Sequence, residues 1–234
     1  MKSGSSGYYV SLILTLTINP AIDRIIVADR LVFEDRGYIL NRAEAPGGRG
    51  INAAQVIHSF GGKTAAILTG GGATGKRLET LLGGLGFPFE VVHVKAESRA
   101  NLTISDKHGL TLKLNELGRP LEAKDLEEIK KRVEAKLTKA RWLMICGSIQ
   151  PGVAPHYYCE IIEMAKARGV KTLLDTDGDA LARGVEAGPT VVTPNQQEAE
   201  RLLNTVLLTR SHSISAALRI VSMGAENVAL SLGC

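Results

Sequence analysis

The sequence predicts an α/β fold, in which a doubly wound, mostly parallel sheet carries a small second sheet. Two observations support this prediction. From residue 121 onward, β-favouring runs alternate with helical runs, which is typical of a parallel sheet covered by helices on both faces. Before that point, short runs of alternating polar and apolar residues are typical of a small exposed sheet. The length of 234 residues suits one large domain, or a domain with an appendage.

The first half of the chain begins with a near-continuous β-favouring run over residues 10–18, which predicts a buried strand. Its loop, residues 19–23, places Asp23 beyond the carboxyl end of that strand, where open α/β sheets bind ligands. A turn-forming role for Asp23 is the alternative. We expect small-sheet strands over 24–27, 38–42, 89–94, 101–104 and 111–114, a main-sheet strand over 64–69, and helices over 53–60 and 76–85.

The second half is more regular. An amphipathic pattern with charges on its outer face predicts a helix over 123–138, and a buried strand over 142–147 follows it. We expect the remaining strands over 170–175, 191–193 and 228–232, and the remaining helices over 155–168, 179–187, 196–203 and 213–223.

The composition excludes several classes of function. Aromatic residues make up 4% of the chain, which argues against a surface that stacks single-stranded nucleic acid, and the net charge of +4 is spread along the chain. No apolar run is long enough to span a membrane. We therefore expect a small-molecule ligand, and neither a nucleic-acid nor a membrane partner.

The cysteines and histidines give no metal signature. Cys146, Cys159 and Cys234 form no CxxC pair, and their odd number favours reduced thiols in the cytoplasm. The five histidines lack metal-ligand spacing, so we interpret them as structural or surface residues. The Gly/Ser-rich segment Met1–Gly7 resembles an added leader, so we expect the domain to cover residues 10–234, after a leader of residues 1–9.

The stretch Pro46–Asn52 is the one around which the chain is organised. Gly47, Gly48 and Gly50 allow a sharp turn and the close approach of a ligand, because no Cβ is present. The helix start behind them offers free N–H groups to an anionic or polyhydroxylated ligand. Asn52 can both donate and accept hydrogen bonds, as sugar recognition requires. The alternative is a glycine-rich turn that only caps the helix.

A second glycine-rich run, Gly70–Arg77, matches two nucleotide motifs in part. It satisfies GxGxxG between a predicted strand and a helix, but Glu90 follows too closely for the usual ribose contact. It nearly satisfies the Walker A pattern, but Arg77 stands where a Ser or Thr must hold magnesium. We therefore favour a close-packed turn that lines the site.

Polar residues that follow predicted strands can converge at one edge of the sheet. Asn195 and Glu198, three positions apart at a helix start, suit hydrated Mg²⁺, and their spacing is also that of a capping box; the two roles are compatible. Arg99 presents a planar fork matched to phosphate oxygens, with a surface arginine as the alternative. The candidates at the strand ends are Asp23, Asn52, Ser148, Asp175, Asn195 and Glu198.

Several motifs occur together in one order. They are Thr17–Asp23, Gly47–Ala54, Gly71–Gly75, Ser98–Asn101, Gly147–Gly152, Leu174–Gly178, Pro194–Glu198 and Ser231–Gly233. In this order, across residues 10–233, they resemble the PfkB branch of the ribokinase family, the sugar and sugar-phosphate kinases, and within it most nearly the phosphofructokinases. The resemblance implies a ribokinase-like fold whose small sheet, from about 24–45 and 88–115, is a lid. It also displaces the dinucleotide interpretation.

The resemblance implies phosphoryl transfer from MgATP to a phosphorylated ketohexose, with fructose 6-phosphate as the expected acceptor, in a cytoplasmic enzyme that forms a homodimer through the lid. Fructose 1-phosphate and tagatose 6-phosphate are the alternative acceptors. The implied sugar-phosphate residues are Asp23, Gly47, Gly48, Asn52, Asn101, Arg99 and Ser148, with Arg36 reaching across the dimer. Asn195, Ser231 and Gly233 would contact ATP, and Asn195 and Glu198 would organise Mg²⁺.

The chain departs from the family pattern at four places. Arg49 replaces a usual Lys, Thr193 replaces a Lys that phosphofructokinases place near the ATP phosphates, and Ile149-Gln150 replaces a common Leu-Pro. The family's Gly-Ala-Gly-Asp motif, which supplies the anion hole and the catalytic base, would lie beyond Cys234. We therefore expect the 234-residue chain to transfer phosphate slowly or not at all. A sugar-phosphate-binding protein without catalysis is the alternative function.

Overall fold

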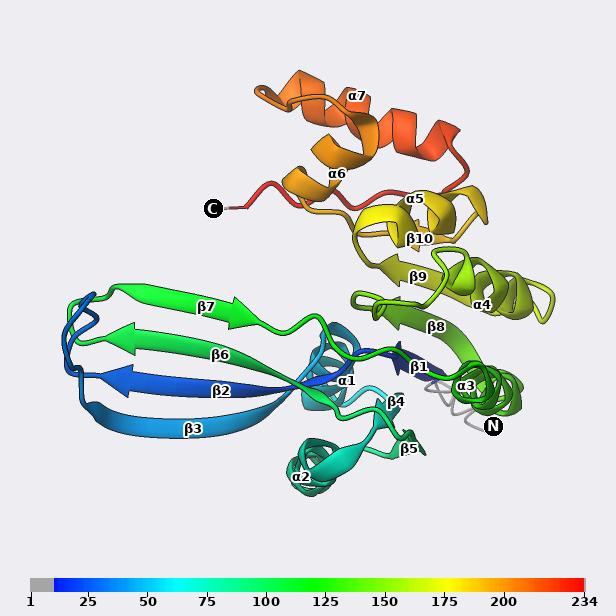
Figure 1. The fold of residues 1–234 in the computed structure, drawn as a ribbon. Coiled ribbons are helices and arrows are strands. Elements are labelled where there is room, and N and C mark those ends of the chain that lie inside the picture. Colours follow the sequence, from blue (N-terminus) through cyan, green and yellow to red (C-terminus); the bar gives the residue numbers. More distant parts are fainter. Residues whose placement is uncertain (1–10, 234) are drawn as a thin grey trace, which may run out of the picture.

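The computed structural model describes residues 11–233 and confirms the predicted parallel sheet with a small second sheet (Figure 1). The large sheet has the strand order β10-β9-β8-β1-β4-β5, and all neighbouring strands are parallel. Because both faces of such a sheet are covered, its central strand can be buried on both sides, as β1 is from Leu14 to Thr17. The strands are β1 (Leu12–Thr17), β4 (Thr64–Gly70), β5 (Phe89–His93), β8 (Ala140–Cys146), β9 (Lys171–Asp175) and β10 (Val191–Val192).

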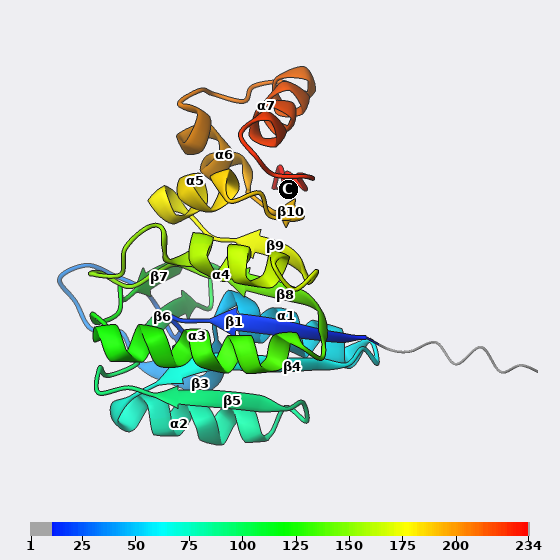
Figure 2. The same cartoon turned by 90° about the vertical axis from the view of Figure 1, so that its right-hand side faces the viewer.

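Helices cover both faces of this sheet. Helices α1 (Arg49–Ser59) and α2 (Gly72–Gly83) lie on one face, and α3 (Ala123–Leu137) and α4 (Tyr157–Lys166) lie on the other (Figures 1 and 2). Helices α5 (Gly178–Glu186), α6 (Gln196–Leu203) and α7 (Arg210–Ser222) follow towards the β10 edge. None of the helices within residues 11–233 is long and apolar enough to cross a membrane.

The core has one cluster on each face of the sheet. On β4, Ala66 and Leu68 pack with Ile51 of α1, whereas the intervening Ile67 packs in the cluster that contains Ile129 of α3. Successive side chains of a strand point to opposite faces, so one short strand contributes to both clusters. This two-sided burial confirms the doubly wound prediction.

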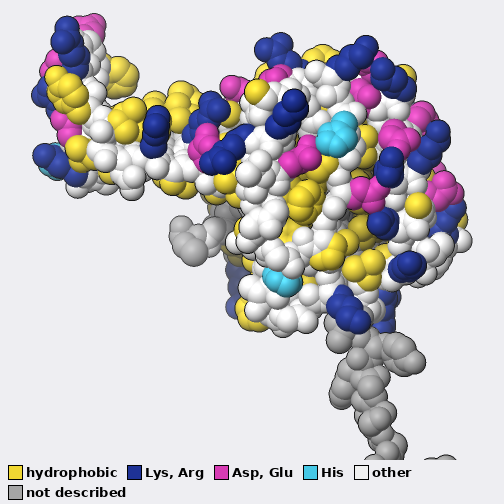
Figure 3. Space-filling view, turned by 90° about the horizontal axis from the view of Figure 1, so that it is seen from below, with side chains coloured by type: hydrophobic (Ala, Val, Ile, Leu, Met, Phe, Trp, Pro, Cys, Tyr) yellow, Lys and Arg dark blue, Asp and Glu magenta, His cyan; other side chains and the backbone are white. Residues whose placement is uncertain are grey.

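The small sheet, which we call the lid, has the order β3-β2-β6-β7. It projects from the body of the molecule, with hydrophobic side chains exposed along it (Figure 3). Its central pair is parallel, and the two outer pairs are antiparallel. The strands are β2 (Ala21–Ala28), β3 (Ile39–Gly47), β6 (Arg99–Asp106) and β7 (Thr111–Asn115).

The predicted lid boundaries need two corrections. The lid strands span 21–47 and 99–115 rather than 24–45 and 88–115. Strand β5, predicted as part of the small sheet, instead pairs with β4 from Phe89 to His93 and forms the edge of the large sheet. The short run of residues gave no information about which sheet it would join. The proposed leader, residues 1–9, lies outside the described residues.

Two helix starts and one predicted strand also differ from the prediction. Helix α1 begins at Arg49 rather than residue 53, and α2 begins at Gly72 rather than residue 76, because the glycine-rich segments themselves form the first helical turns. The strand predicted over 228–232 is absent from the described sheet. That segment makes only isolated parallel bridges, Val192 with Val228 and Asn195 with Ser231.

The start of α1 packs unusually close to β1. A Cβ added at Gly50 would lie 2.4 Å from Thr17 Oγ1, 3.0 Å from the Leu16 carbonyl oxygen and 3.3 Å from Cys146 Cβ. Only glycine therefore allows the start of α1 to pack this close to the carboxyl ends of β1 and β8.

We predict that Gly50→Ala lowers the free energy of unfolding by about 1–3 kcal/mol, because the added methyl group must displace well-packed atoms. The matched control is Gly83→Ala at the end of α2, where an added Cβ meets nothing within 4 Å. That substitution should leave stability unchanged or raise it by up to about 1 kcal/mol, since alanine favours helix. Urea unfolding of both variants checks this, and equal effects would contradict the packing argument.

Candidate functional site

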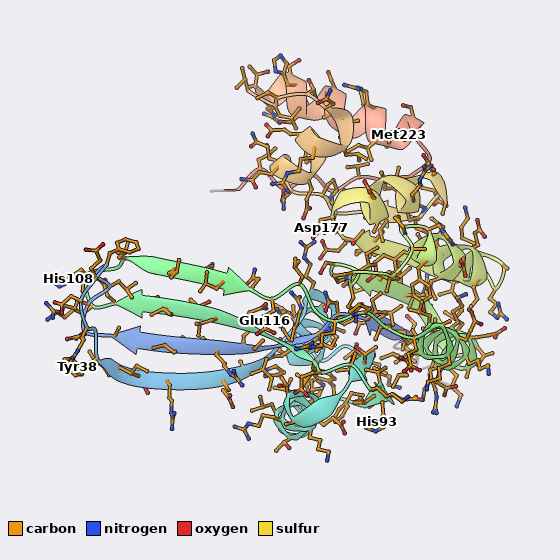
Figure 4. All side chains as sticks on the ribbon, viewed as in Figure 1. Tyr38, His93, His108, Glu116, Asp177 and Met223 are labelled. Carbon is orange, nitrogen blue, oxygen red and sulfur yellow. The ribbon has the colours of Figure 1, made fainter. Side chains whose placement is uncertain are left out.

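A cavity of about 430 Å³ lies between the base of the lid and the carboxyl edge of the large sheet. Arg99 and Glu116 line it from the lid side, and Ser148 and Asp177 line it from the large sheet. Figure 4 shows Glu116 at the base of the lid and Asp177 across from it, at the start of α5. Ligands of open α/β sheets bind at this edge, so the cavity is the candidate site.

Asp23 lies at this edge, but not in the predicted loop. Residues 21–23 already belong to β2, where Asp23 pairs in register with Asn101 of β6. Asn101 Nδ2 donates a hydrogen bond of 2.8 Å to Asp23 Oδ1. Gly47 pairs with Ala21, and a Cβ at Gly47 would fall 2.4 Å from Asp23 Oδ1. The glycine is therefore required for the carboxylate to take this position.

Arg99 is fixed by backbone acceptors from two elements. Its Nε donates to the Asn19 carbonyl oxygen at 3.1 Å, and its Nη1 donates to the Glu116 carbonyl oxygen at 2.7 Å. Burial lowers the pKa of Arg99, opposed by the nearby Asp23 and Asp177 carboxylates. An arginine still keeps its charge at neutral pH, so a fixed cation lines the cavity.

Ser148 follows β8 and lines the same cavity as Arg99. Its Oγ accepts a hydrogen bond of 3.2 Å from Asn19 Nδ2, which orients the hydroxyl oxygen. Asn19 Nδ2 also donates to the Leu117 carbonyl oxygen at 3.0 Å. Asn19 therefore joins the large sheet to the chain that leaves the lid, and it holds Ser148 beside Arg99.

Arg49 forms ion pairs with three carboxylates. Its Nη1 lies 3.1 Å from Asp175 Oδ1, and its Nη2 lies 3.0 Å from Asp177 Oδ2 and 3.1 Å from Glu198 Oε1. Burial raises the pKa of Asp175, with Arg49 opposing that effect. Burial alone would lower the pKa of Arg49, but the three carboxylates together raise it. The guanidinium is therefore held in its charged form at the centre of this cluster.

Asn195 and Glu198 form the predicted capping box at the start of α6. Asn195 Oδ1 accepts the Glu198 N–H at 2.9 Å, and Glu198 Oε2 accepts the Asn195 N–H at 2.9 Å. These carboxylate and amide oxygens are of the type that Mg²⁺ prefers. No group of three His, Cys, Asp or Glu side chains in residues 11–233 is arranged to surround a metal by itself. The donor set thus fits a magnesium ion held mainly by other ligands, with Glu198 as its carboxylate.

The other predicted residues lie around the site at varying distance. Gly48 caps α1 with a φ of 134°, and Asn52 is exposed one turn later. Ser231 bridges Asn195, and its N–H donates to the Pro194 carbonyl oxygen, so it lies beside the start of α6, two positions before Gly233. Arg36 does not join the site of its own chain. It lies in the exposed loop between β2 and β3, at the far end of the lid, where Figure 4 labels Tyr38.

Sequence reasoning missed the roles of Asn19, Glu116 and Asp177. Asn19 and Asp177 lie inside the quoted motifs, at strand ends, so their position alone could have raised them as candidates. Glu116 contributes its backbone carbonyl oxygen to Arg99, and a backbone role leaves no signal in the sequence. Arg49 was noted only as a departure from the family pattern.

The second glycine-rich run is close-packed, as predicted, but it forms the end of β4 and the start of α2, and none of its residues lines the candidate cavity. A Cβ at Gly72 would lie 1.6 Å from Glu97 Oε2, and a Cβ at Gly71 would lie 2.0 Å from the Ala96 carbonyl oxygen. Glu97 Oε1 accepts the Thr74 N–H at 2.7 Å at the start of α2. The chain's own carboxylate thus occupies this helix start, where a nucleotide phosphate would meet like charge.

The comparisons with known proteins agree with this geometry. Residues 15–234 match the family described as pfkB family carbohydrate kinase. The chain belongs to this family. A solved structure of phosphofructokinase-2 from Escherichia coli in complex with fructose-6-phosphate superposes with a TM-score of 0.89 at 31% identity, covering 95% of this chain and 74% of that one. The predicted ribokinase-like architecture is thereby confirmed.

Curated relatives carry three different names. An ATP-dependent 6-phosphofructokinase isozyme 2 of Mycobacterium tuberculosis is 30% identical, covering 94% of this chain and 66% of its own length. A tagatose-6-phosphate kinase of Staphylococcus epidermidis is 28% identical, covering 92% and 73%. A 1-phosphofructokinase of Borreliella burgdorferi is 27% identical, covering 95% and 71%. The chain therefore spans about two thirds to three quarters of the length of these relatives, whose names differ in the sugar phosphate.

We predict that Glu97→Gln lowers the free energy of unfolding by about 0.5–1 kcal/mol at pH 7, through loss of the charged cap of α2. Hydrogen bonds from Thr74 hold the pKa of Glu97 below its ordinary value of 4.5. The contribution of the Glu97 carboxylate to the free energy of unfolding is therefore fully present above pH 4.5. It is lost as the pH falls through the lowered pKa of the folded state.

Urea unfolding at pH 7 and pH 3 checks this prediction. The difference between the Glu97→Gln variant and the unsubstituted chain should shrink at pH 3. Glu163→Gln, at an exposed position of α4, is the matched control and should change stability little at either pH. A difference that stays constant with pH would argue against a charge-dependent cap.

Proposed function

We propose that this protein transfers the terminal phosphoryl group of ATP to a hydroxyl of a phosphorylated ketohexose. Fructose 6-phosphate is the expected acceptor, with fructose 1-phosphate and tagatose 6-phosphate as alternatives. The observation that carries the proposal is the half-buried cation of Arg99, which lines a cavity together with Ser148 and lies two positions before Asn101, the hydrogen-bond partner of Asp23. Membership of the pfkB family, with relatives named as kinases of these sugar phosphates, supports it.

The sugar hydroxyls would be held on the lid side of the site. Asp23 has acceptor capacity beyond the bond from Asn101, and Asn101 Oδ1 is a buried acceptor without a partner among residues 11–233. A buried unpaired acceptor is costly, so a hydroxyl donor from a ligand would stabilise it. The exposed amide of Asn52 and the backbone of Gly47 and Gly48 would complete the contacts to the sugar.

The phosphate already on the sugar would be held by Arg99 and Ser148. Arg99 presents a charged planar fork whose orientation is set by Asn19 and Glu116 before the ligand arrives. Such preorganisation reduces the entropy lost on binding. Arg36, at the end of the lid, would reach the phosphate only in the site of a second copy.

The nucleotide would lie across the start of α6, beside Asn195, Ser231 and Gly233. Glu198 and Asn195 would hold Mg²⁺, which supplies charge neutralisation for the phosphate groups when bound. The chain's own contribution is orientation of both substrates and exclusion of water by the lid, which disfavours hydrolysis of ATP.

We predict that Arg99→Ala weakens binding of fructose 6-phosphate by about 10- to 100-fold, because a charged hydrogen bond to phosphate is lost. Binding of unphosphorylated fructose should change little. Arg119→Ala, at an exposed position outside this cavity, is the matched control and should leave both affinities unchanged. Isothermal titration with each sugar measures the effect, without requiring turnover.

A panel of acceptors with MgATP tests the reaction itself. Transfer to fructose 6-phosphate, fructose 1-phosphate or tagatose 6-phosphate, at a rate above that of the unphosphorylated sugars, supports the proposal and selects the substrate. Binding of all three without transfer would favour the non-catalytic alternative. Failure of all three to bind, together with binding of an unphosphorylated sugar or a nucleoside, would show that the role given to Arg99 is wrong.

We also propose that two copies associate through the lid. Strand register puts Leu102 of β6 beside Leu114 of β7, and Ile104 beside Leu112, on the face opposite Asp23 and Asn101. Leu112 and Leu114 are 46% and 51% exposed. An exposed apolar face on a projecting sheet is typical of an interface. A cytoplasmic location is proposed as well, which the free thiols of Cys146 and Cys159 support.

Leu112→Glu should disrupt this association, because it places a charge in the apolar face of the lid. We expect a shift from dimer to monomer in analytical ultracentrifugation. Thr111→Glu adds the same charge to the opposite face of β7 and should leave the association state unchanged. The proposed interface would be contradicted if both Leu112→Glu and Thr111→Glu remained dimers, or if the unsubstituted chain were a monomer.

A further inference from the structure

Arg49 links two halves of the site that are distant in the sequence. It is the first residue of α1, directly after the glycines proposed to contact the sugar. Its guanidinium contacts Asp175 at the end of β9, Asp177 at the start of α5 and Glu198 at the start of α6. The segment Gly47–Asn52, which we call the sugar loop, therefore sends the Arg49 side chain among the residues proposed for the nucleotide and its metal.

The three carboxylates outnumber the single guanidinium. When all are ionised, one positive and three negative charges leave a surplus of two negative charges, and Arg99 is the other nearby cation. Three carboxylates around one point would repel one another strongly without a cation between them. The positive charge of Arg49 therefore offsets part of this repulsion.

Glu198 is the carboxylate whose bonding matters most. It is 6% exposed, its Oε2 accepts the Asn195 N–H, and its Oε1 faces Arg49 Nη2. Nη2 is shared between Glu198 and Asp177, so neither of them has a two-point pairing with the guanidinium. A shared single contact is weaker than a bidentate pair, and it can be exchanged for another acceptor.

We propose that Arg49 competes with the divalent cation for Glu198, and that it holds this carboxylate until nucleotide phosphates arrive. Phosphate oxygens match the planar fork of an arginine, so they offer Arg49 an alternative acceptor and free Glu198 for the metal. Binding of metal without nucleotide is thereby disfavoured. This inference rests on the proposed function in assigning Glu198 to the metal and in bringing nucleotide phosphates to Arg49.

The test is the affinity for Mn²⁺, used as the probe ion in the absence of nucleotide and measured by the electron paramagnetic resonance of the free ion. Arg49→Gln should bind Mn²⁺ at least about tenfold more tightly than the unsubstituted chain, since Glu198 loses the guanidinium that competes with the ion. Arg119→Gln removes the same charge from an exposed position outside the cavity and should leave the affinity unchanged. Adding Glu198→Gln to the Arg49→Gln variant should abolish the gain.

Arg49→Lys covers the case in which Arg49→Gln does not fold. A lysine keeps the charge but loses the fork, so we expect a smaller gain in Mn²⁺ affinity with thermal unfolding close to that of the unsubstituted chain. Folded variants that bind Mn²⁺ no more tightly than Arg119→Gln would overturn the proposal and leave Arg49 a purely structural role. A gain that survives Glu198→Gln would also overturn it.

A separate measurement distinguishes this inference from the proposed function. Glu198→Gln alone should weaken binding of ADP with Mn²⁺ if Glu198 lies on the metal side of the nucleotide. An unchanged affinity there would refute the metal assignment of Glu198, whatever the result for Arg49. If Glu198→Gln weakens binding of ADP with Mn²⁺ but Arg49→Gln does not raise the affinity for Mn²⁺, only the competition between Arg49 and the metal is refuted.

Discussion

The close contact between the start of α1 and the end of β1 sets the geometry of the whole site. Gly50 lies against Thr17, Leu16 and Cys146, and a larger residue would push the helix away from the sheet. Because Gly48 and Arg49 precede it, their positions follow from this contact. The sugar loop and the guanidinium are thus placed by packing in the core, which is stiffer than any loop could be by itself.

The site also depends on a polar connection between the two sheets. Asn19 leaves β1, orients Ser148 and bonds the chain that follows the lid, while its carbonyl oxygen holds Arg99. A lid attached only by its connecting segments could change its angle freely. These bonds fix the base of the lid, so that Arg99 and Ser148 line the cavity together.

Local sequence patterns predicted a large part of the fold. The β-favouring run of β1, the amphipathic pattern of α3 and the Asn195–Glu198 capping box depend on neighbours within a few residues, and all three are found in the structure. The motif order likewise identified the family. The predicted lid failed at β5, because a five-residue strand contains no information about the sheet it joins.

The sequence by itself therefore determined most of the helices and strands, the fold class and the residue types at the strand ends, because these follow from short-range periodicity and from motifs. Only the tertiary structure decided which of these residues meet. Arg49 contacts Asp175 and Glu198 from 126 and 149 positions away, and Glu97 caps α2 from 23 positions beyond Thr74. Such pairings arise where separate strands end at one edge of a sheet, and no local pattern encodes them.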